Sequence, residues 1–314
     1  MNTPMNIIVE LSSYCQLACP FCRTGNALRE KYPQVPRGML SQKTFKNIIF
    51  KVPAIEEMLL YNWGEPFLNP DILWFVMFGK KVANKCVLST NMHVMTEELA
   101  RGLVEFGLDK IFISCDGMSQ ESYAAYRVGG SLETVLHNTR LLTEAKKRLG
   151  LSNPQIIFQC IVNKFNEPEI EDYEAFAKSH GADRVRLIPI CGLTPEGYKM
   201  QGEYAPVSPA WPPFQNLGSV KNCRYPTISM VFDWNGDVYT CCSPSGIQEY
   251  AMGNINESTF NEIWNSNKYK YVRRFCESGN PEQNEYKIMC FACYGIFPSE
   301  KSFRQDMWRG CFES

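Results

Sequence analysis

Three cysteines near the N-terminus have the spacing of ligands for an iron–sulfur cluster. Cys15, Cys19 and Cys22 lie in the sequence Cys-Gln-Leu-Ala-Cys-Pro-Phe-Cys, with no fourth Cys close by. Four-iron clusters usually have one Cys on each iron, so three thiolates would leave one iron open to an outside molecule. A structural zinc site is the alternative, but such sites pair two close ligands with a second, distant pair. The triad therefore indicates a cluster that can bind a reactant.

A second group of cysteines lies in the C-terminal part of the chain. Four thiols could bind a further cluster in which every iron is occupied: they are Cys223, Cys241, Cys290 and Cys293. Zinc held by four Cys is the alternative for this set. Cys276 and Cys311 could replace one of these ligands, and the sequence leaves their roles open.

The bulk composition excludes several other classes of protein. The 314-residue chain is 45% apolar and 21% charged, and its formal net charge of −1 gives no sign of a nucleic-acid or membrane partner. It has no apolar run of membrane-spanning length and no N-terminal secretion signal. Because 14 cysteines occur without such a signal, a reducing cytoplasm is favoured over a disulfide framework.

Strand-like and helix-like segments alternate through the first two thirds of the chain. The expected strands are Ile7–Leu11, Glu57–Asn62, Cys86–Thr90, Lys110–Cys115, Ile156–Val162 and Arg184–Ile190. Ser41, Thr96 and Ser131 are typical helix N-caps, and Gly107, Gly150 and Gly181 are typical helix ends. Six strand–helix units in series predict a parallel sheet with right-handed crossovers.

The pattern leaves two arrangements of this sheet open, a partial barrel and a doubly wound open sheet. In both, reactive residues are expected at the C-terminal ends of the strands, where the triad also lies. We expect a first domain over 1–191, a Pro-rich linker or lid over 192–219, and a second domain over 220–314.

The second domain has its own expected elements. Strands Ile228–Phe232 and Val238–Thr240 flank Asn235-Gly236, which predicts a β-hairpin. One helix is expected from about Thr259 to Phe275.

The ordered motifs at the strand ends resemble those of the radical S-adenosylmethionine (SAM) superfamily. The resemblance covers essentially the whole chain and rests on Cys15-x-x-x-Cys19-x-Phe21-Cys22, Asn62-Trp63-Gly64-Glu65-Pro66, Ser89-Thr90-Asn91, Ser114-Cys115-Asp116-Gly117, and Tyr126-Arg127 before Gly129-Gly130. Trp63 departs from the family's Gly-Gly-Glu-Pro turn, in which this position is Gly. The fold implied is a partial (β/α)6 TIM-like barrel, followed here by a small α+β auxiliary domain.

The resemblance implies cofactors and the residues that hold them. Cys15, Cys19 and Cys22 would hold a [4Fe-4S] cluster, and SAM would chelate the open iron. Glu65 would accept hydrogen bonds from the methionyl ammonium, while Ser114 and Arg127 would contact the carboxylate or ribose. Further cofactor-binding positions implied by the motifs are Phe21, Gly64, Thr90, Asn91 and Asp116. An external one-electron reductant such as flavodoxin or ferredoxin is also implied.

The C-terminal part resembles the SPASM extension or its shorter twitch form, which binds auxiliary clusters. The similarity lies in Asp233 to Cys242, Gly253-Asn254-Ile255 and Glu262-Ile263-Trp264. The further closely spaced Cys residues of a full SPASM extension are missing after Cys293, so one auxiliary [4Fe-4S] cluster with four Cys is expected.

The resemblance implies that a 5′-deoxyadenosyl radical takes a hydrogen atom from substrate. We expect a small polar substrate, a sugar or aminocyclitol, whose alcohol carbon is oxidised or epimerised. The layout with one auxiliary cluster is similar to that of aminocyclitol dehydrogenases, which favours oxidation. Cys115, Cys191 and Cys242 are candidate hydrogen-atom donors for epimerisation, although a Cys is more often simply buried.

Two alternatives remain. One is modification of a ribosomally made peptide, which is weakened by the short stretch before Cys15, because such enzymes often carry a leader-binding domain there. The other is a non-catalytic iron–sulfur or zinc protein, which anaerobic reconstitution would distinguish.

Overall fold

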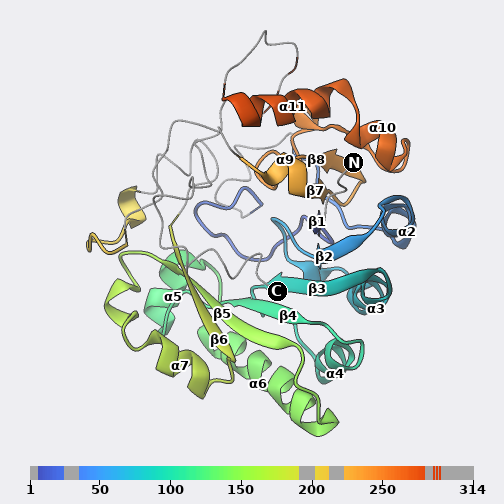
Figure 1. Ribbon diagram of the computed structural model, residues 1–314. Helices are drawn as coiled ribbons and strands as arrows, with labels where there is room; N and C mark the ends of the chain where they lie inside the picture. Colours follow the sequence, from blue (N-terminus) through green and yellow to red (C-terminus); the bar gives the residue numbers. More distant parts are fainter. Residues whose placement is uncertain are drawn as a thin grey trace. The chain divides into compact units, whose positions relative to one another are not determined.

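A computed structural model describes residues 6–24, 35–190, 202–211 and 223–279, together with Tyr286, Ile288 and Cys290. The chain forms two compact units (Figure 1). The first unit comprises Met1–Tyr14, Pro33–Cys86 and Gln215–Lys301, and the second comprises Cys15–Tyr32, Val87–Phe214 and Ser302–Ser314.

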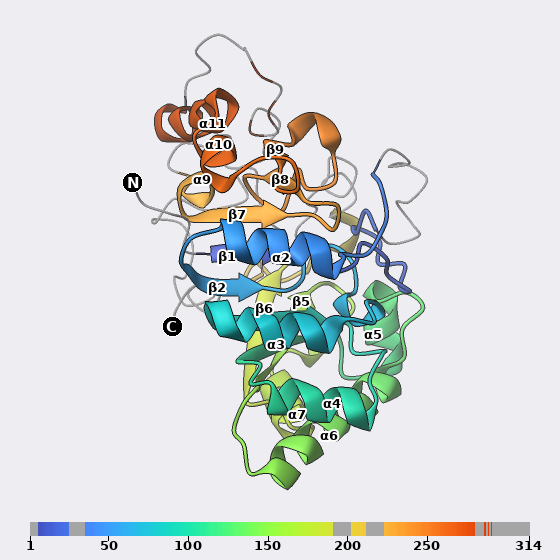
Figure 2. The same cartoon turned by 90° about the vertical axis from the view of Figure 1, so that its right-hand side faces the viewer.

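The first unit contains parallel strands extended by a hairpin. Its strands are β1 (Asn6–Val9), β2 (Ile55–Leu59), β7 (Ser229–Phe232), β8 (Asp237–Tyr239) and β9 (Gly253–Asn254), in the spatial order β2-β1-β7-β8-β9. β1 is parallel to both β2 and β7, whereas β8 is antiparallel to its neighbours. Its helices are α2 (Gln42–Lys51), α3 (Ile72–Val82), α9 (Tyr225–Ile228), α10 (Phe260–Trp264) and α11 (Asn267–Ser278). Figure 2 shows α2 beside β1 and β2.

The second unit is a parallel α/β layer. β3 (Ala83–Thr90) runs into it from the first unit and is followed in space by β4 (Lys110–Ser114), β5 (Gln155–Val162) and β6 (Arg184–Pro189). All three of these pairings are parallel. The helices are α4 (Glu97–Glu105), α5 (Gln120–Tyr126), α6 (Leu132–Leu149) and α7 (Tyr173–Ser179), and α4, α6 and α7 lie beside the strands (Figure 1).

Local sequence signals explain most of the helix boundaries. The hydroxyls of Ser41, Thr96 and Ser131 each accept a backbone N–H in the first turn of α2, α4 and α6, as predicted. Gly150 ends α6 with a left-handed φ of 65°. All six expected strands are present, and a described helix follows each of the first five. The α/β prediction is confirmed.

Two local predictions differ from the structure. The single helix expected from Thr259 to Phe275 is two helices, because Asn265 ends α10 and the Ser266 hydroxyl caps α11. The helices α3 and α5 were not predicted. The hairpin around Asn235-Gly236 is present, and its strand β7 also pairs with β1, which the local pattern did not indicate.

The expected Pro-rich segment 192–219 is described only over 202–211. None of the helices in the described part of the chain is both long and apolar enough to cross a membrane.

Candidate functional site

The three N-terminal cysteines lie together in an apolar environment of the second unit. Their side chains pack with a cluster formed by Leu17, Cys19, Phe21, Tyr126 and Ile190. Cys19 is buried, whereas Cys15 and Cys22 are half-buried. The Cys22 N–H donates to the Cys19 carbonyl at 3.2 Å, so the segment turns back on itself between these two thiols.

Each thiol of the triad has its own polar contact. Asn91 Nδ2 donates to Cys15 Sγ at 3.5 Å, Arg127 Nη1 donates to Cys19 Sγ at 3.7 Å, and Cys22 Sγ lies 2.9 Å from Thr24 Oγ1. Burial raises the pKa of Cys19, and the charge of Arg127 opposes this effect. Hydrogen bonds to sulfur and the apolar surroundings are the features by which proteins tune iron–sulfur clusters. The donor set and its surroundings therefore fit a cluster with three Cys ligands.

The described residues contain no group of three His, Cys, Asp or Glu side chains arranged around a single metal ion.

Arg127 is held beside Cys19 by a buried ion pair. It is the C-cap of α5, and its Nε contacts Asp116, which follows β4 and is completely buried. The other oxygen of Asp116 accepts the Ile161 N–H. Burial alone would lower the pKa of Arg127, but the attraction of Asp116 and Cys19 keeps it well above its usual value. An Arg before two glycines, often a surface loop residue, here lies against an expected cluster ligand.

The turn after β3 contacts Cys15 through Asn91. Thr90 Oγ1 accepts the Met92 N–H at 2.9 Å, and Met92 has a left-handed φ of 61°. Asn91 Oδ1 accepts from Gln16 Nε2 at 3.0 Å while its amide donates to Cys15. His93 Nε2 accepts the Ser131 N–H at 2.8 Å, so this ring fastens the turn to the start of α6. Thr90 and Asn91 belong to a motif that the sequence analysis singled out, whereas no motif indicated Gln16 or His93.

Ser114 is the last residue of β4, and Cys115 follows it directly. Ser114 is in register with Gln159, and Gln159 is in register with Arg186, so these three residues share one face. Ile161, two residues beyond Gln159 on that face, packs against the cluster around the triad. Cys115 is fully buried, its thiol donates to the Gly117 carbonyl, and burial raises its pKa to about 12.

The Gly64-Glu65-Pro66 turn lies in the first unit, against the chain that leads to the triad. The Glu65 N–H donates to the carbonyl of Tyr14, the residue before Cys15, at 2.7 Å. A Cβ on Gly64 would lie 1.9 Å from the Ser12 carbonyl oxygen, so only glycine fits there. The Glu65 side chain is 2% exposed, and its Oε1 accepts the Phe67 N–H at 3.0 Å.

The C-terminal thiols of the first unit lie around β7, β8 and α11. Cys223 precedes α9, and Cys241 and Cys242 follow β8. Cys223 forms a hydrogen bond with Cys276 of α11, and this bond together with burial raises the pKa of Cys223. Cys191, Cys293 and Cys311 lie outside the described residues. Cys276, whose role the sequence left open, is therefore a direct neighbour of Cys223.

Tyr204, which no motif indicated, packs beside the triad in the second unit. Its ring lies 5.1 Å from Phe21, 6.3 Å from Tyr126 and 5.6 Å from Phe165 between ring centroids. The carboxylate of Glu167 anchors the same segment by accepting the N–H groups of Val207 and Ser208, each at 2.7 Å. The sequence signal that could have identified Tyr204 is an aromatic residue within an otherwise Pro- and Gly-rich stretch.

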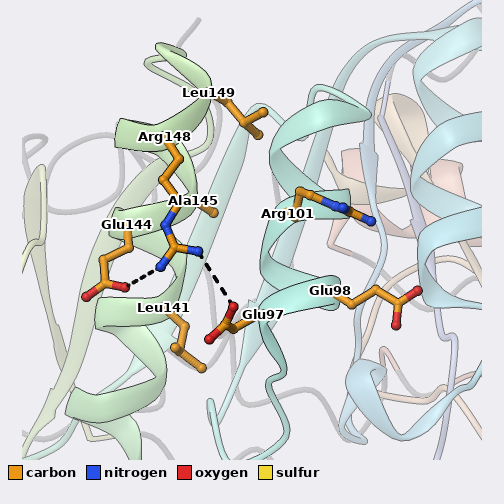
Figure 3. Close-up of a pocket in the computed structure, with 8 residues that line it drawn as sticks. All are labelled: Glu97, Glu98, Arg101, Leu141, Glu144, Ala145, Arg148 and Leu149. Carbon is orange, nitrogen blue, oxygen red and sulfur yellow. Dashed lines mark hydrogen bonds and ion pairs between the residues drawn. The ribbon is translucent and has the colours of Figure 1, made fainter.

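A separate cavity of about 380 Å³ lies on the helix layer of the second unit, between α4 and α6 (Figure 3). Arg148 crosses it and pairs with Glu97 and Glu144 at 3.6 and 3.3 Å. None of the expected site residues lines this cavity.

Two protein-family models match the chain. The model of the radical SAM superfamily matches residues 9–188, which is more than half of the chain, and the chain belongs to this superfamily. The model of SPASM, an iron–sulfur cluster-binding domain, matches residues 223–294. The protein is thus a radical SAM enzyme with a SPASM domain. Its cofactors are the radical SAM [4Fe-4S] cluster, SAM and an auxiliary iron–sulfur cluster.

Several relatives are similar over nearly the whole chain. An AdoMet-dependent heme synthase of Methanosarcina barkeri is 24% identical over 93% of this chain and 91% of its own. A cofactor-modifying protein for tungsten-containing aldehyde ferredoxin oxidoreductase from Pyrococcus furiosus is 22% identical over 85% and 82%.

Solved structures share the fold. BtrN in complex with AdoMet and 2-DOIA has a TM-score of 0.53 and 17% identity, covering 88% of this chain and 89% of BtrN. Streptococcus suis SuiB bound to its precursor peptide SuiA has a TM-score of 0.64 and 15% identity, covering 88% and 68%. The fold is therefore the partial barrel of radical SAM enzymes with a C-terminal mixed region, as predicted, and not a doubly wound sheet.

Proposed function

We propose that this enzyme removes a hydrogen atom from a small polar substrate, a sugar or aminocyclitol, and oxidises or epimerises an alcohol carbon. The observation that carries the proposal is the row Ser114, Gln159 and Arg186 on the sheet face that also bears Ile161. Arg186 Nη1 donates to Gln159 Oε1 at 3.1 Å, so hydrogen-bonding groups line a face that continues to the triad. Such a face suits a substrate rich in hydroxyl groups.

We assign each site residue the role that its motif position implies. Cys15, Cys19 and Cys22 hold the radical SAM cluster, and Cys223, Cys241, Cys290 and Cys293 hold the auxiliary cluster. When bound, the open iron and SAM supply a 5′-deoxyadenosyl radical that abstracts hydrogen.

The SAM-contacting residues are assigned from the motif positions that they occupy. Glu65 accepts hydrogen bonds from the methionyl ammonium, and Gly64 allows the Glu65 turn to lie close against the Ser12 backbone. Phe21, Thr90 and Asn91 shape the triad segment and the turn that supports it. Ser114 offers a hydroxyl to the carboxylate or ribose, and Asp116 keeps Arg127 charged and oriented.

Two outcomes are open to the substrate radical. If the carbon radical gives one electron to the auxiliary cluster and its hydroxyl group gives up a proton, the product is a ketone. Return of a hydrogen atom from a thiol to the opposite face gives the epimer. Cys242 is the described thiol that suits the second outcome, because it is half-exposed. Cys115 suits it less, because it is fully buried.

The decisive experiment uses candidate polyols deuterated at single carbons with the anaerobically reconstituted enzyme. Deuterium in 5′-deoxyadenosine identifies the carbon that is attacked, and product analysis separates ketone from epimer. Cys242→Ala should abolish multiple turnovers of an epimerase and leave an oxidase active, whereas Cys115→Ala is the matched control. Failure of every polyol to raise 5′-deoxyadenosine formation above the substrate-free rate would refute the substrate class.

A peptide substrate is the second candidate. It is favoured by relatives named PqqA peptide cyclase from Gluconobacter oxydans, 25% identical over 59% of this chain, and mycofactocin maturase MftC from Mycobacterium tuberculosis, 23% identical over 87%. Deuterated precursor peptides in the same assay would reveal this activity.

A further inference from the structure

Two side chains of the Glu65 turn contact the loop that follows β8. Within the first unit, Trp63 Nε1 donates to the backbone carbonyl of Cys242 at 2.8 Å. The neighbouring Asn62 Nδ2 donates to Ser245 Oγ at 2.7 Å. The turn is thus joined at consecutive residues to a loop that begins with Cys241.

Both ends of this connection are anchored. The Trp63 N–H donates to Glu10 Oε1 at 3.2 Å, and Glu10 is 4% exposed directly after β1. Ser245 is buried and donates to the buried carboxylate of Asp233, at the end of β7. Because the indole and its anchors are bonded to structured backbone, a shift of the loop is transmitted to the turn.

The turn and the loop that these hydrogen bonds connect carry proposed ligands for two different cofactors. Glu65 lies two residues after Trp63 and is proposed to bind the SAM ammonium. Cys241 precedes Cys242 and is proposed to bind the auxiliary cluster. The Gly-Gly-Glu-Pro turn that this segment resembles has Gly in place of Trp63 and therefore offers no indole donor there.

We propose that Trp63 is a positioning residue that couples SAM binding at Glu65 to occupancy of the auxiliary site at Cys241. The proposal rests on these two assignments in the proposed function. An auxiliary cluster fixes Cys241 and the Cys242 carbonyl, which orders Trp63 and hence the Glu65 turn before SAM arrives. Coupling between sites is reciprocal, so bound SAM equally stabilises the auxiliary loop.

The test measures the SAM dissociation constant by equilibrium dialysis, without reductant and therefore without turnover. Four full-chain proteins form a cycle: wild type, Trp63→Phe, Cys241→Ala and the double variant. We expect Cys241→Ala to weaken SAM binding about tenfold when Trp63 is present and less than about twofold when Phe replaces it. An equal effect of Cys241→Ala in both backgrounds would overturn the proposal.

Matched variants keep the result interpretable. Trp74→Phe makes the same chemical change on α3, where the ring packs against Phe45 and Phe75, and should preserve the tenfold coupling. If Cys241→Ala does not fold, Cys223→Ala removes a different auxiliary ligand and enters the same cycle. Trp63→His keeps a ring N–H and should restore part of the coupling.

A spectroscopic readout is independent of SAM affinity. In wild type, adding SAM should change the electron paramagnetic resonance signal of the reduced auxiliary cluster, and Trp63→Phe should lose this change. Conversion of a polyol with no coupling would refute only the role of Trp63. Coupling without conversion of any polyol would refute only the proposed substrate class.

Discussion

Arg127 Nη1 lies 3.7 Å from Cys19 Sγ while its Nε contacts Asp116, so one guanidinium joins an expected cluster ligand to a buried carboxylate. This arrangement places a positive charge and a hydrogen-bond donor on one sulfur of the triad. Such contacts favour the more negative, reduced state of a cluster.

Replacing Arg127 with Gln should lower the midpoint potential of the radical SAM cluster. If the hydrogen bond from Arg127 favours the reduced cluster about tenfold, its loss lowers the one-electron midpoint potential by about 60 mV. An anaerobic redox titration followed by electron paramagnetic resonance measures the shift. Arg101→Gln, an exposed change on α4, is the control, and equal potentials in all three proteins would contradict the role of Arg127.

Replacing Asp116 with Asn should destabilise the protein by about 3–5 kcal/mol, because the buried Arg127 loses its counter-charge. Denaturant unfolding of the metal-free protein measures this loss. The double variant Asp116→Leu with Arg127→Met should recover much of the stability, since it removes both charges. A single variant as stable as wild type would show that the pair is not buried in solution.

Replacing Gly64 with Ala should weaken SAM binding by at least about tenfold, because small displacements of binding groups are costly. The added Cβ would meet the Ser12 carbonyl at 1.9 Å and push the Glu65 turn away. Gly202→Ala is the matched control, since a Cβ there has no neighbour within 4 Å. Equilibrium dialysis with SAM distinguishes the two, and equal affinities would argue against the close approach.

Replacing Tyr204 with Ala should speed the loss of the radical SAM cluster in air. The ring contacts Phe21, Tyr126 and Phe165, and each aromatic pair contributes about 0.5–1.5 kcal/mol beyond its buried area. The decay of visible absorbance after exposure to oxygen gives the rate. Phe50→Ala, at a ring that is 79% exposed on α2, should decay as wild type does. Identical rates for Tyr204→Ala and wild type would rule out shielding by this ring.

His93 should make stability depend on pH below about 6.5. Burial lowers the pKa of His93 from 6.5, and repulsion from Arg127 adds to this, while the contact with the Asn91 carbonyl opposes it. As the pH falls from 6.5 towards the lowered pKa, the unfolded chain binds a proton that the folded protein does not, so stability decreases. The slope is at most about 1.4 kcal/mol per pH unit and levels off below the lowered pKa.

The measurement for His93 is denaturant unfolding of the metal-free protein at several pH values. His93→Gln should lose this component of the slope, whereas His137→Gln, at an exposed position on α6, should keep it. A slope unchanged by His93→Gln would assign the pH dependence to other groups.

Sequence reasoning was most accurate where the signal is local. The caps Ser41, Thr96 and Ser131, the glycine end of α6 and the hairpin at Asn235-Gly236 all follow from side chains acting within a few residues. The spacing of the three cysteines identified the triad. The expectation that the strand-end motifs lie near one another follows because parallel strands bring their C-terminal ends to one edge.

The contacts that the sequence did not predict join residues far apart in the chain. Trp63 was recognised only as a departure from a motif, yet its indole donates to Cys242. Tyr204 was part of an expected linker, yet it packs against Phe21. Such pairs leave no periodicity in the sequence, since packing and not local preference brings them together.

The pairing of β1 with β7 has a consequence for the order in which the protein can form. Ile7 of β1 lies opposite Met230 of β7. One edge of β1 is therefore paired by a strand that is translated much later. A ribosome-bound chain that ends before β7 would expose the N–H and C=O groups of β1 along that edge, as an aggregation-prone edge strand does. The segment that begins the SPASM match at residue 223 thus also completes the sheet of the first unit. Synthesis of the chain as far as β7 must therefore precede the pairing that covers this edge of β1.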